Sequence, residues 1–396
     1  SRSATLTAYE ANADGSQGAE VGVVVTQDYL ARSATTGSFE ALTWDGTVEG
    51  EVVSDGKYIL ELSVLKALGD PANPAHTETF TSEPFTIGSE ATDPTSPEVI
   101  RYTGDDRFAT AARIAAETAP GVETVYIATG LDYPDALAGA ARAGSEGAPV
   151  LLVRADSIPA ATRFELSRLE PQNIVVLGGD TVIQGSVASA LRDFTDGDVT
   201  RVSGLDRYDT AVQISAVHDP GVDTVYVATG TEFPDALAGA ARAGALDGPV
   251  LLVKQDRIPA TTRAELERLT PGNIVLLGGT EAISAGVEAD LGALGTVDRV
   301  SGIDRYATAA AISQDYEPGT GVAFVATGLD FPDALAGAAR AGHLEGPVLL
   351  VKPDRIPRAT LAELERLEAR QIVILGGFTA VSADVEAQIA ALIYGD

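Results

Sequence analysis

The sequence predicts a multidomain protein, in which an N-terminal all-β domain precedes three α/β repeats of one kind. The main observation is a stretch that occurs three times, over residues 128–144, 228–244 and 326–342. Within it, the equivalent aspartates Asp135, Asp235 and Asp333 lie 100 and then 98 residues apart. Recurrence at a nearly fixed period indicates one structural unit repeated in tandem. A second observation is that residues 1–88 lack these motifs and read as strands.

Each copy of the stretch reads as a strand, a turn and a helix. In the second copy, residues 225–229 are short, apolar and β-branched, as in a strand buried on both faces. Gly230 allows a turn, Pro234 suits the first helical position, and Asp235 is favoured beside the positive end of the helix dipole. Small residues make the helix slim enough to lie close against a sheet. With the apolar run 249–253, this βαβ step predicts a parallel sheet with a right-handed crossover.

Two further motifs complete each repeat. A strand with a glycine turn opens it, at residues 99–104, 201–204 and 299–302, and a later strand such as 273–277 ends in paired glycines before a closing helix. About four strands alternating with helices predict a layered α/β fold. The third repeat ends without another opening strand. If the repeats form a ring, we expect the strand near Arg101 to lie beside the last repeat.

Composition limits the functions that the chain can have. Its 396 residues carry a formal net charge of −30, which argues against binding to nucleic acid or to an anionic membrane. No apolar run approaches the roughly 20 residues of a membrane helix. The absence of cysteine excludes disulfides and thiolate chemistry. The chain begins at Ser1 and has no methionine, so we expect a mature or excised fragment of a longer protein.

The first 88 residues differ from the repeats. Residues 19–27 and 58–64 have strand character, with turn signals between apolar runs, and predict a small antiparallel β-sandwich. Residues 44–46, 55–58 and 67–70 resemble an Ig-like domain of flagellar hook-capping proteins and secreted bacterial enzymes, in which that domain is usually a spacer. A polar segment with two prolines predicts an extended linker. The predicted domains are the Ig-like domain 1–88, the linker 89–97, and the repeats 98–198, 199–296 and 297–396.

Four motifs recur in order in the repeats: Arg-Val-Ser-Gly-x-Asp-Arg-Tyr, Ala-Thr-Gly-x-x-Phe-Pro-Asp-Ala-Leu-Ala-Gly, Pro-Val-Leu-Leu-Val and Ile-Val-Leu-Leu-Gly-Gly. In this combination residues 98–396 resemble the cell wall-binding repeat 2 family. The resemblance implies three Rossmann-like units packed as a pseudo-threefold trimer within one monomeric chain. It also implies an extracellular module that attaches a secreted protein non-covalently to an anionic secondary polymer, a glycan of the Gram-positive cell wall.

An Ile-Leu-Leu signature of that family is implicated in anchoring. It maps here onto Val150, Leu151 and Leu152, onto Val250, Leu251 and Leu252, and onto Val348, Leu349 and Leu350, with valine in the first place. An apolar run of this kind after a proline is typical of a buried core strand. We therefore expect any effect of the signature on binding to be indirect, through the stability of the fold.

Direct contact with an anionic polymer requires hydrogen-bond donors and local positive charge. Two sets of arginines repeat in register: Arg107, Arg207 and Arg305 at one helix start, and Arg142, Arg242 and Arg340 on the helix of the repeated stretch. The alternative for each is a structural ion pair with a nearby aspartate such as Asp106, Asp206 or Asp304. Glycine turns such as 178–179 follow strands, where backbone N–H groups can meet a phosphate, but turn geometry explains them equally well.

Few residues suggest catalysis. The histidines His76, His218 and His343 occupy non-equivalent positions, where we expect surface residues, and no nucleotide-binding motif is present. Asp132 and Asp135 could act as a carboxylate pair on a glycan, but a helix start also explains Asp135. We expect no catalytic residue, no metal and no cofactor. Two alternatives stay open, a surface-layer or adhesion module that binds protein and a glycan-active hydrolase.

Overall fold

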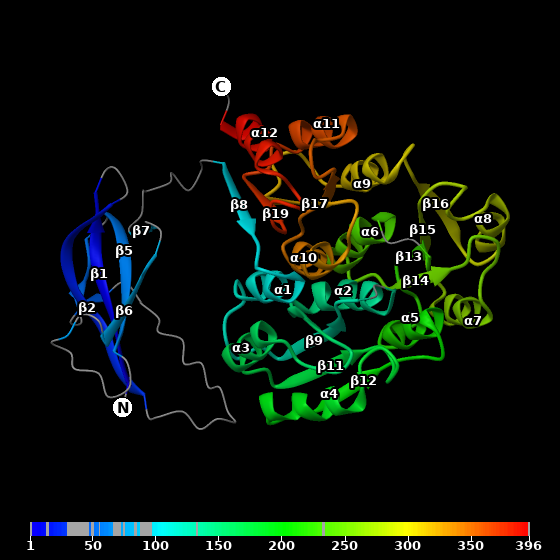
Figure 1. Cartoon of the computed structure of the whole chain (residues 1–396). Helices are drawn as coiled ribbons and strands as arrows, with labels where there is room; N and C mark the ends of the chain where they lie inside the picture. Colours follow the sequence, from blue (N-terminus) through cyan, green and yellow to red (C-terminus); the bar gives the residue numbers. More distant parts are fainter. Residues whose placement is uncertain are drawn as a thin grey trace. The chain divides into compact units, whose positions relative to one another are not determined.

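The computed structural model of the chain describes residues 2–12, 16–29, 47–48, 51–54, 56–65, 73, 76–82, 85–87, 97–131, 134–231 and 234–394. The chain divides into two compact units, Ser1–Ser96 and Pro97–Asp396, which are considered separately (Figure 1). No described helix is long and apolar enough to cross a membrane.

The N-terminal unit is an antiparallel sheet with the strand order β2-β1-β5-β6, and β7 also pairs with β5. Its strands are β1 (Arg2–Ala11), β2 (Gln17–Tyr29), β5 (Gly56–Leu65), β6 (Thr77–Thr81) and β7 (Phe85–Ile87), with a separate ribbon of β3 (Thr47–Val48) and β4 (Glu51–Val52). The two predicted strands thus fall in β2 and β5. Most of the Ig-like motif, residues 44–46, 55 and 67–70, lies outside the described residues, as does the predicted linker over 89–96.

The larger unit contains three parallel sheets of four strands, as predicted. The first sheet has the order β10-β9-β11-β12, and the others have the equivalent orders β14-β13-β15-β16 and β18-β17-β19-β8. The strands are β9 (Thr124–Thr129), β10 (Val150–Val153), β11 (Asn173–Leu177), β12 (Val199–Val202), β13 (Thr224–Thr229), β14 (Val250–Val253), β15 (Asn273–Leu277), β16 (Thr296–Val300), β17 (Val322–Thr327), β18 (Val348–Val351), β19 (Gln371–Leu375) and β8 (Glu98–Tyr102).

Twelve α-helices cover these sheets in the described part of the unit. Those of the first repeat are α1 (Arg107–Ala115), α2 (Pro134–Glu146), α3 (Ala160–Leu169) and α4 (Gly185–Ala190), which continues as a 3₁₀ helix over Leu191–Phe194. The others are α5 (Arg207–Ser215), α6 (Pro234–Ala245), α7 (Ala260–Leu269), α8 (Ala285–Leu291), α9 (Arg305–Ser313), α10 (Pro332–His343), α11 (Arg358–Leu367) and α12 (Ala383–Tyr394).

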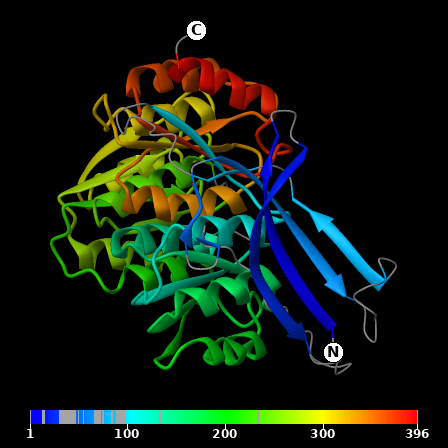
Figure 2. The same cartoon turned by 90° about the vertical axis from the view of Figure 1, so that its left-hand side faces the viewer.

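The last strand of each sheet comes from the start of the next repeat around the ring, and we call it the borrowed strand. β12 and β16 open the second and third repeats but pair with β11 and β15 of the preceding repeat. β8, at the start of the unit, pairs with β19 at its end, with Glu98 opposite Gln371 and Tyr102 opposite Leu375. Both views show the cyan strand β8 beside the red helix α12 (Figures 1 and 2). This pairing confirms the expected position of the strand near Arg101, and it closes the three repeats into a ring.

Glycines allow the three central helices to meet at the middle of the ring. α2, α6 and α10 contact one another in all three pairs. A Cβ atom placed on Gly144 would lie 3.5 Å from the Cα of Gly244 and 3.4 Å from the Cα of Gly342. The same helices also lie close to their sheets, since a Cβ on Gly139 would overlap the side chain of Leu177. The small residues predicted for packing on a sheet therefore serve two contacts.

The apolar core has one shared part and three separate parts. Inward-facing residues of the strands, such as Tyr126 and Ala128, join the central helices in a single cluster that spans all three repeats. Outward-facing residues of the same strands, such as Val125 and Ile127, form a separate cluster in each repeat with the outer helices. Burial on both faces explains why these strands are continuously apolar.

Candidate functional site

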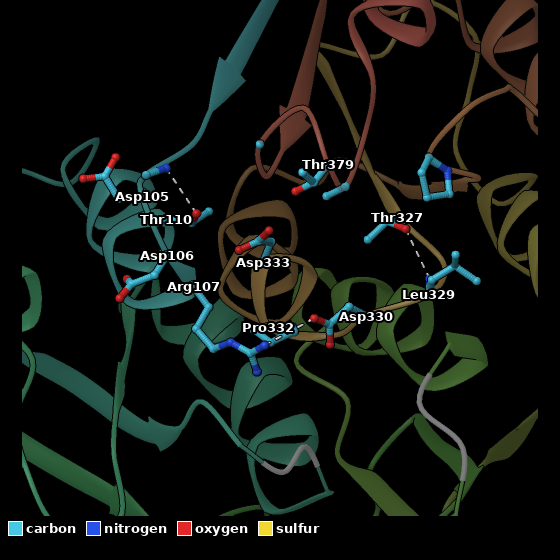
Figure 3. A pocket seen from close by; sticks show the side chains of 14 residues that line it. Asp105, Asp106, Arg107, Thr110, Thr327, Leu329, Asp330, Pro332, Asp333 and Thr379 are labelled. Atoms are coloured by element: carbon cyan, nitrogen blue, oxygen red, sulfur yellow. Dashed lines mark hydrogen bonds and ion pairs between the residues drawn. The ribbon is translucent and has the colours of Figure 1, made fainter.

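A cleft of about 330 Å³ lies where the third repeat meets the first, and we name it the third–first cleft (Figure 3). The first repeat lines it with Gly104, Asp105, Asp106, Arg107 and Thr110, and the third with Thr327, Leu329, Asp330, Pro332, Asp333, Pro353, Gly377, Thr379 and Ala380. The turns after β17 and β19 therefore face the start of α1. Carboxyl ends of parallel strands are where ligands of open α/β sheets usually bind.

A second cleft, of about 230 Å³, occupies the equivalent place between the first and second repeats. Its lining includes Thr129, Asp135 and Gly179 from the first repeat, and Leu205, Asp206, Arg207 and Thr210 from the second. Each lining set has a counterpart in the third–first cleft. The molecule thus repeats one arrangement, with an aspartate at the start of a central helix opposite an arginine of the next repeat.

The aspartates next to the first arginine set cap helices. Asp106 Oδ1 accepts hydrogen bonds from the N–H groups of Phe108 and Ala109, at 3.0 and 2.9 Å. Asp206 caps α5 in the same way, and Asp304 caps α9 by accepting from the Ala307 N–H group. Such capping satisfies N–H groups that lack a partner in the first helical turn.

Backbone carbonyls hold the first arginine set, of which Arg107 and Arg207 line the two clefts. Nη1 of Arg107, Arg207 and Arg305 donates to the carbonyl oxygens of Gly130, Gly230 and Gly328 at 2.6, 2.6 and 2.8 Å. Arg107 also pairs with Asp330 of the third repeat, at 3.4 Å, and its side chain is 35% exposed. Figure 3 shows this arginine reaching across the cleft toward Asp330. The geometry fixes the guanidinium and leaves part of it open to solvent.

A further cation lies near each of these arginines, and the sequence reasoning missed it. Arg154 lies over the ring of Phe108, Lys254 over Tyr208 and Lys352 over Tyr306, at 5.1, 5.4 and 5.5 Å from the ring centres. These distances allow cation–π attraction. Each cation directly follows the repeated Val-Leu-Leu-Val strand, so its fixed position in the repeat could have identified it from the sequence.

The second arginine set lies between repeats. Arg242 Nε is 3.7 Å from Asp315 Oδ2, and its guanidinium stacks 4.6 Å from the ring centre of Tyr316 in the next repeat. Arg340 of the third repeat lies near Glu117 of the first. Burial raises the pKa of the Glu117 carboxyl, but Arg113, Tyr102 and, to a smaller extent, Arg340 lower it below its ordinary value.

Arg142 departs from this pattern. It pairs with Glu146 on its own helix, and Glu146 also accepts a hydrogen bond from the Tyr126 hydroxyl at 2.6 Å. The residue of the next repeat that corresponds to Glu117 and Asp315 is Val217, which offers no charge. The acidic partner has therefore moved to the helix of the arginine.

The signature strand is buried in every repeat. Val150, Leu151 and Leu152, and the residues equivalent to them in β14 and β18, are 0–2% exposed. The carbonyl of Leu152 accepts a hydrogen bond from the buried Thr162 hydroxyl at 2.7 Å, and the same bond recurs at Leu252 and Leu350. A polymer has no access to these side chains. A part in anchoring through the fold stays a prediction.

Asp333 is the unusual carboxyl of the third–first cleft. Burial raises its pKa to about 6, and Asp330 adds to this, while Thr110 and Arg107 act in the opposite direction. Its Oδ1 atom is buried and has no hydrogen-bond partner among the described residues. A buried carboxylate oxygen in this state is costly unless a ligand supplies a donor.

The structure describes only part of the carboxylate pair considered for catalysis. Asp132 and Glu232 lie outside the described residues, and Asp135 lies against the turn at Gly178, where a Cβ would be 2.7 Å from its Oδ2. Among the described residues no group of three or more His, Asp or Glu side chains could hold a metal ion. The expectation that His218 lies at the surface was wrong, because its side chain is 10% exposed and packs near the junction of two repeats.

These features define a class of protein, a ring of repeated α/β units that presents similar clefts at its junctions. The model of the family described as cell wall binding domain 2 (CWB2) matches residues 101–188, 201–288 and 299–386, and the chain belongs to this family. Proteins with these repeats are associated with the cell wall, and the repeats are binding modules.

Curated relatives and solved structures agree with this assignment. The chain is 29% identical over 294 residues to the amidase enhancer of Bacillus subtilis strain 168, covering 74% of this chain and 40% of the relative. It is 26% identical over 298 residues to N-acetylmuramoyl-L-alanine amidase LytC of the same organism, covering 75% and 59%. The chain thus matches less than two thirds of the length of either relative.

The fold resembles that of two solved structures from Clostridium difficile. Cwp6 matches with a TM-score of 0.70 at 22% identity, over 99% of this chain and 63% of that one. Cwp8 matches with a TM-score of 0.69 at 24% identity, over 87% and 60%.

Proposed function

We propose that the ring anchors its protein non-covalently to an anionic secondary polymer of a Gram-positive cell wall, through the clefts between the repeats. The observation that carries this proposal is the recurrence of one arrangement at the junctions, with an arginine held by a glycine carbonyl at the start of each receiving helix. A polymer repeats its units, so a rigid body with several equivalent weak sites gains avidity on it.

Local positive charge supports binding of an anion by a chain with a net charge of −30. Arg107, Arg207 and Arg305 are the proposed contacts, and Arg154, Lys254 and Lys352 add a cation beside each of them. By contrast, Arg142, Arg242 and Arg340 serve the proposal less well than the sequence suggested, since none of them lines either of the two clefts.

Wall retention of arginine variants tests the proposal. The triple variant Arg107→Gln, Arg207→Gln, Arg305→Gln should sediment with purified walls at least about tenfold more weakly, because charge-assisted hydrogen bonds to the polymer are lost. The matched control removes the same charge away from the clefts, at Arg113, Arg163 and Arg263. Equal losses in the two variants, or equal retention by walls with and without their secondary polymer, would refute the proposal.

The remaining features fit an anchor. We propose that the N-terminal unit is an Ig-like spacer, that the module acts outside the cell as a monomer, and that it performs no catalysis. The resemblance to LytC supports this last point, because family repeats account for most of the present chain. Release of sugar from walls by the purified chain would instead favour the hydrolase alternative.

A further inference from the structure

The third–first cleft is acidic overall, although it contains one of the proposed polymer contacts. Its charged lining residues are one guanidinium, Arg107, and four carboxyl groups, those of Asp105, Asp106, Asp330 and Asp333. Arg107 is already paired with Asp330. A phosphate or carboxylate that entered this space would therefore meet more negative than positive charge at short range.

Asp333 is placed to accept hydrogen bonds from a ligand. Its side chain points into the cleft (Figure 3), and its buried Oδ1 has no partner among the described residues. By contrast, Oδ1 of Asp106 already accepts hydrogen bonds from N–H groups at the N-terminus of α1. A donor group of a ligand, such as a hydroxyl, would remove the cost of the unsatisfied acceptor.

The size and the apolar part of the lining indicate the kind of ligand. About 330 Å³ is the lower range of small-ligand sites. Leu329, which is 61% exposed, lines the cleft together with Pro332 and Pro353. A sugar ring carries hydroxyl donors on its edge and C–H groups on its faces, so it matches both the carboxylate and the apolar surface.

We propose that an uncharged sugar unit of the polymer occupies the third–first cleft, with its hydroxyls donating to Asp333, while the anionic groups of the polymer stay outside. This inference rests on the proposed function and deepens it by naming the unit that enters the site. The anionic groups can meet the cations that lie over the aromatic rings, Arg154, Lys254 and Lys352.

The first–second cleft carries several of the same elements. It combines Asp135, Arg207 and Thr210 with Leu205, which is 98% exposed and stands where the third–first cleft has Asp105. An apolar side chain so fully exposed at the edge of a polar cleft is suited to the C–H face of a sugar. We infer that this cleft takes the same class of unit.

The pH dependence of binding distinguishes an uncharged from an anionic ligand. A hydroxyl donor stabilises the ionised form of Asp333, lowers its pKa from about 6, and makes binding stronger as pH rises from 5 to 7.5. An anion would be repelled by the same ionisation, so its binding would weaken over this range. The other charged groups facing Asp333 are Arg107, Asp105, Asp106 and Asp330, and the turn at Pro353 adds Lys352 and the ion pair of Arg355 with Asp354.

The experiment measures the affinity of the whole chain for purified Gram-positive walls at pH 5 and pH 7.5, with Asp333→Asn and the control His343→Gln. We expect wild-type affinity to be up to about tenfold higher at pH 7.5, one unit of pKa change on binding being tenfold in affinity. Asp333→Asn should abolish this difference and bind about tenfold more weakly at pH 7.5, while unfolding at no lower temperature. His343→Gln should keep the wild-type profile.

Three results would overturn the inference. They are stronger wild-type binding at pH 5, a gain of affinity in Asp333→Asn at pH 7.5, and a loss of wild-type binding on addition of EDTA, which would indicate that the carboxylates hold a bridging cation. Absence of wall binding at both pH values would instead reject the proposed function itself.

Discussion

The junction between the third and first repeats differs from the other two in its connectivity. At the first two junctions the borrowed strands, β12 and β16, follow the sheet that they complete in the chain. At the third junction β8 comes from the opposite end of the unit and joins β19 only through non-covalent contacts. The last helix is also longer here, since α12 has 12 residues and α8 has 7, and α12 contacts β8. The comparison teaches that packing and hydrogen bonds at this junction take the place of a covalent connection.

We expect the largest loss of stability when β8 is removed. A chain that begins at Thr103 leaves the edge of β19 unpaired, and the Gly376 N–H loses the Tyr102 carbonyl that accepts its hydrogen bond at 2.8 Å. We expect loss of cooperative thermal unfolding, or a fall in Tm of at least about 10 °C. The control chain begins at Pro97 and keeps β8, and its Tm should match that of the whole ring. Similar Tm values for the two truncations would show that β8 is dispensable.

An arginine stands one residue before the end of each borrowed strand, and its contacts can be compared between the junctions. Arg101 donates to the Gly376 carbonyl at 2.7 Å, pairs with Glu386 at 3.0 Å and stacks on Phe378. Arg201, at a covalent junction, donates to the carbonyls of Gly178 and Ile183 and pairs with the exposed Asp180 at 3.1 Å. Both arginines therefore bind the turn after the neighbouring strand.

The two alanine variants should differ in stability. We expect Arg101→Ala to lower the free energy of unfolding by about 4 kcal/mol, because its side chain is 8% exposed and Glu386 is left unpaired. Arg201→Ala should cost about 2 kcal/mol, the value of its hydrogen bonds. Denaturant unfolding measures both, and equal losses would mean that the buried pair of Arg101 with Glu386 adds no stability beyond the hydrogen bonds to the turn.

The carboxyl of Asp333 makes the third junction sensitive to pH. Its pKa is about 6 in the folded chain, against an ordinary value of 3.8, so the folded state binds a proton more tightly than the unfolded state. Stability from this group therefore falls as pH rises from about 4 to 6. Asp333→Asn should be as stable as the wild type near pH 4 and more stable by about 3 kcal/mol at pH 7.5. Thermal unfolding across this range gives the result, and parallel pH profiles for the two proteins would contradict it.

Much of the ring could be predicted from local patterns. The strand predicted over 273–277 is β15, and the helix predicted to begin at Pro234 is α6. The missing fourth strand of the third repeat could be placed beside its end from the repeat pattern alone. The Ig-like nature of the N-terminal unit stays a prediction.

The site was less accessible to sequence reasoning. The roles of Arg101, Arg201 and Arg299 as donors to the glycine turns depend on the pairing of strands from different repeats. Likewise, the closeness of Gly144, Gly244 and Gly342 at the centre depends on how the helices meet. A local pattern contains no information about such distant partners. The register of the repeats therefore identified two sets of arginines but did not show which set lines the clefts.

The pairing of β8 with β19 also determines where a polypeptide enters and leaves the ring. Entry at Glu98 and exit at the end of α12 lie on one side, since α12 packs on β8. A pulling force applied between the two ends of the unit would therefore act mainly on β8 and α12. Little of this force would reach the first–second cleft. The ring can therefore stay bound to a wall while a force acts between its two ends, and the ring itself is not extended.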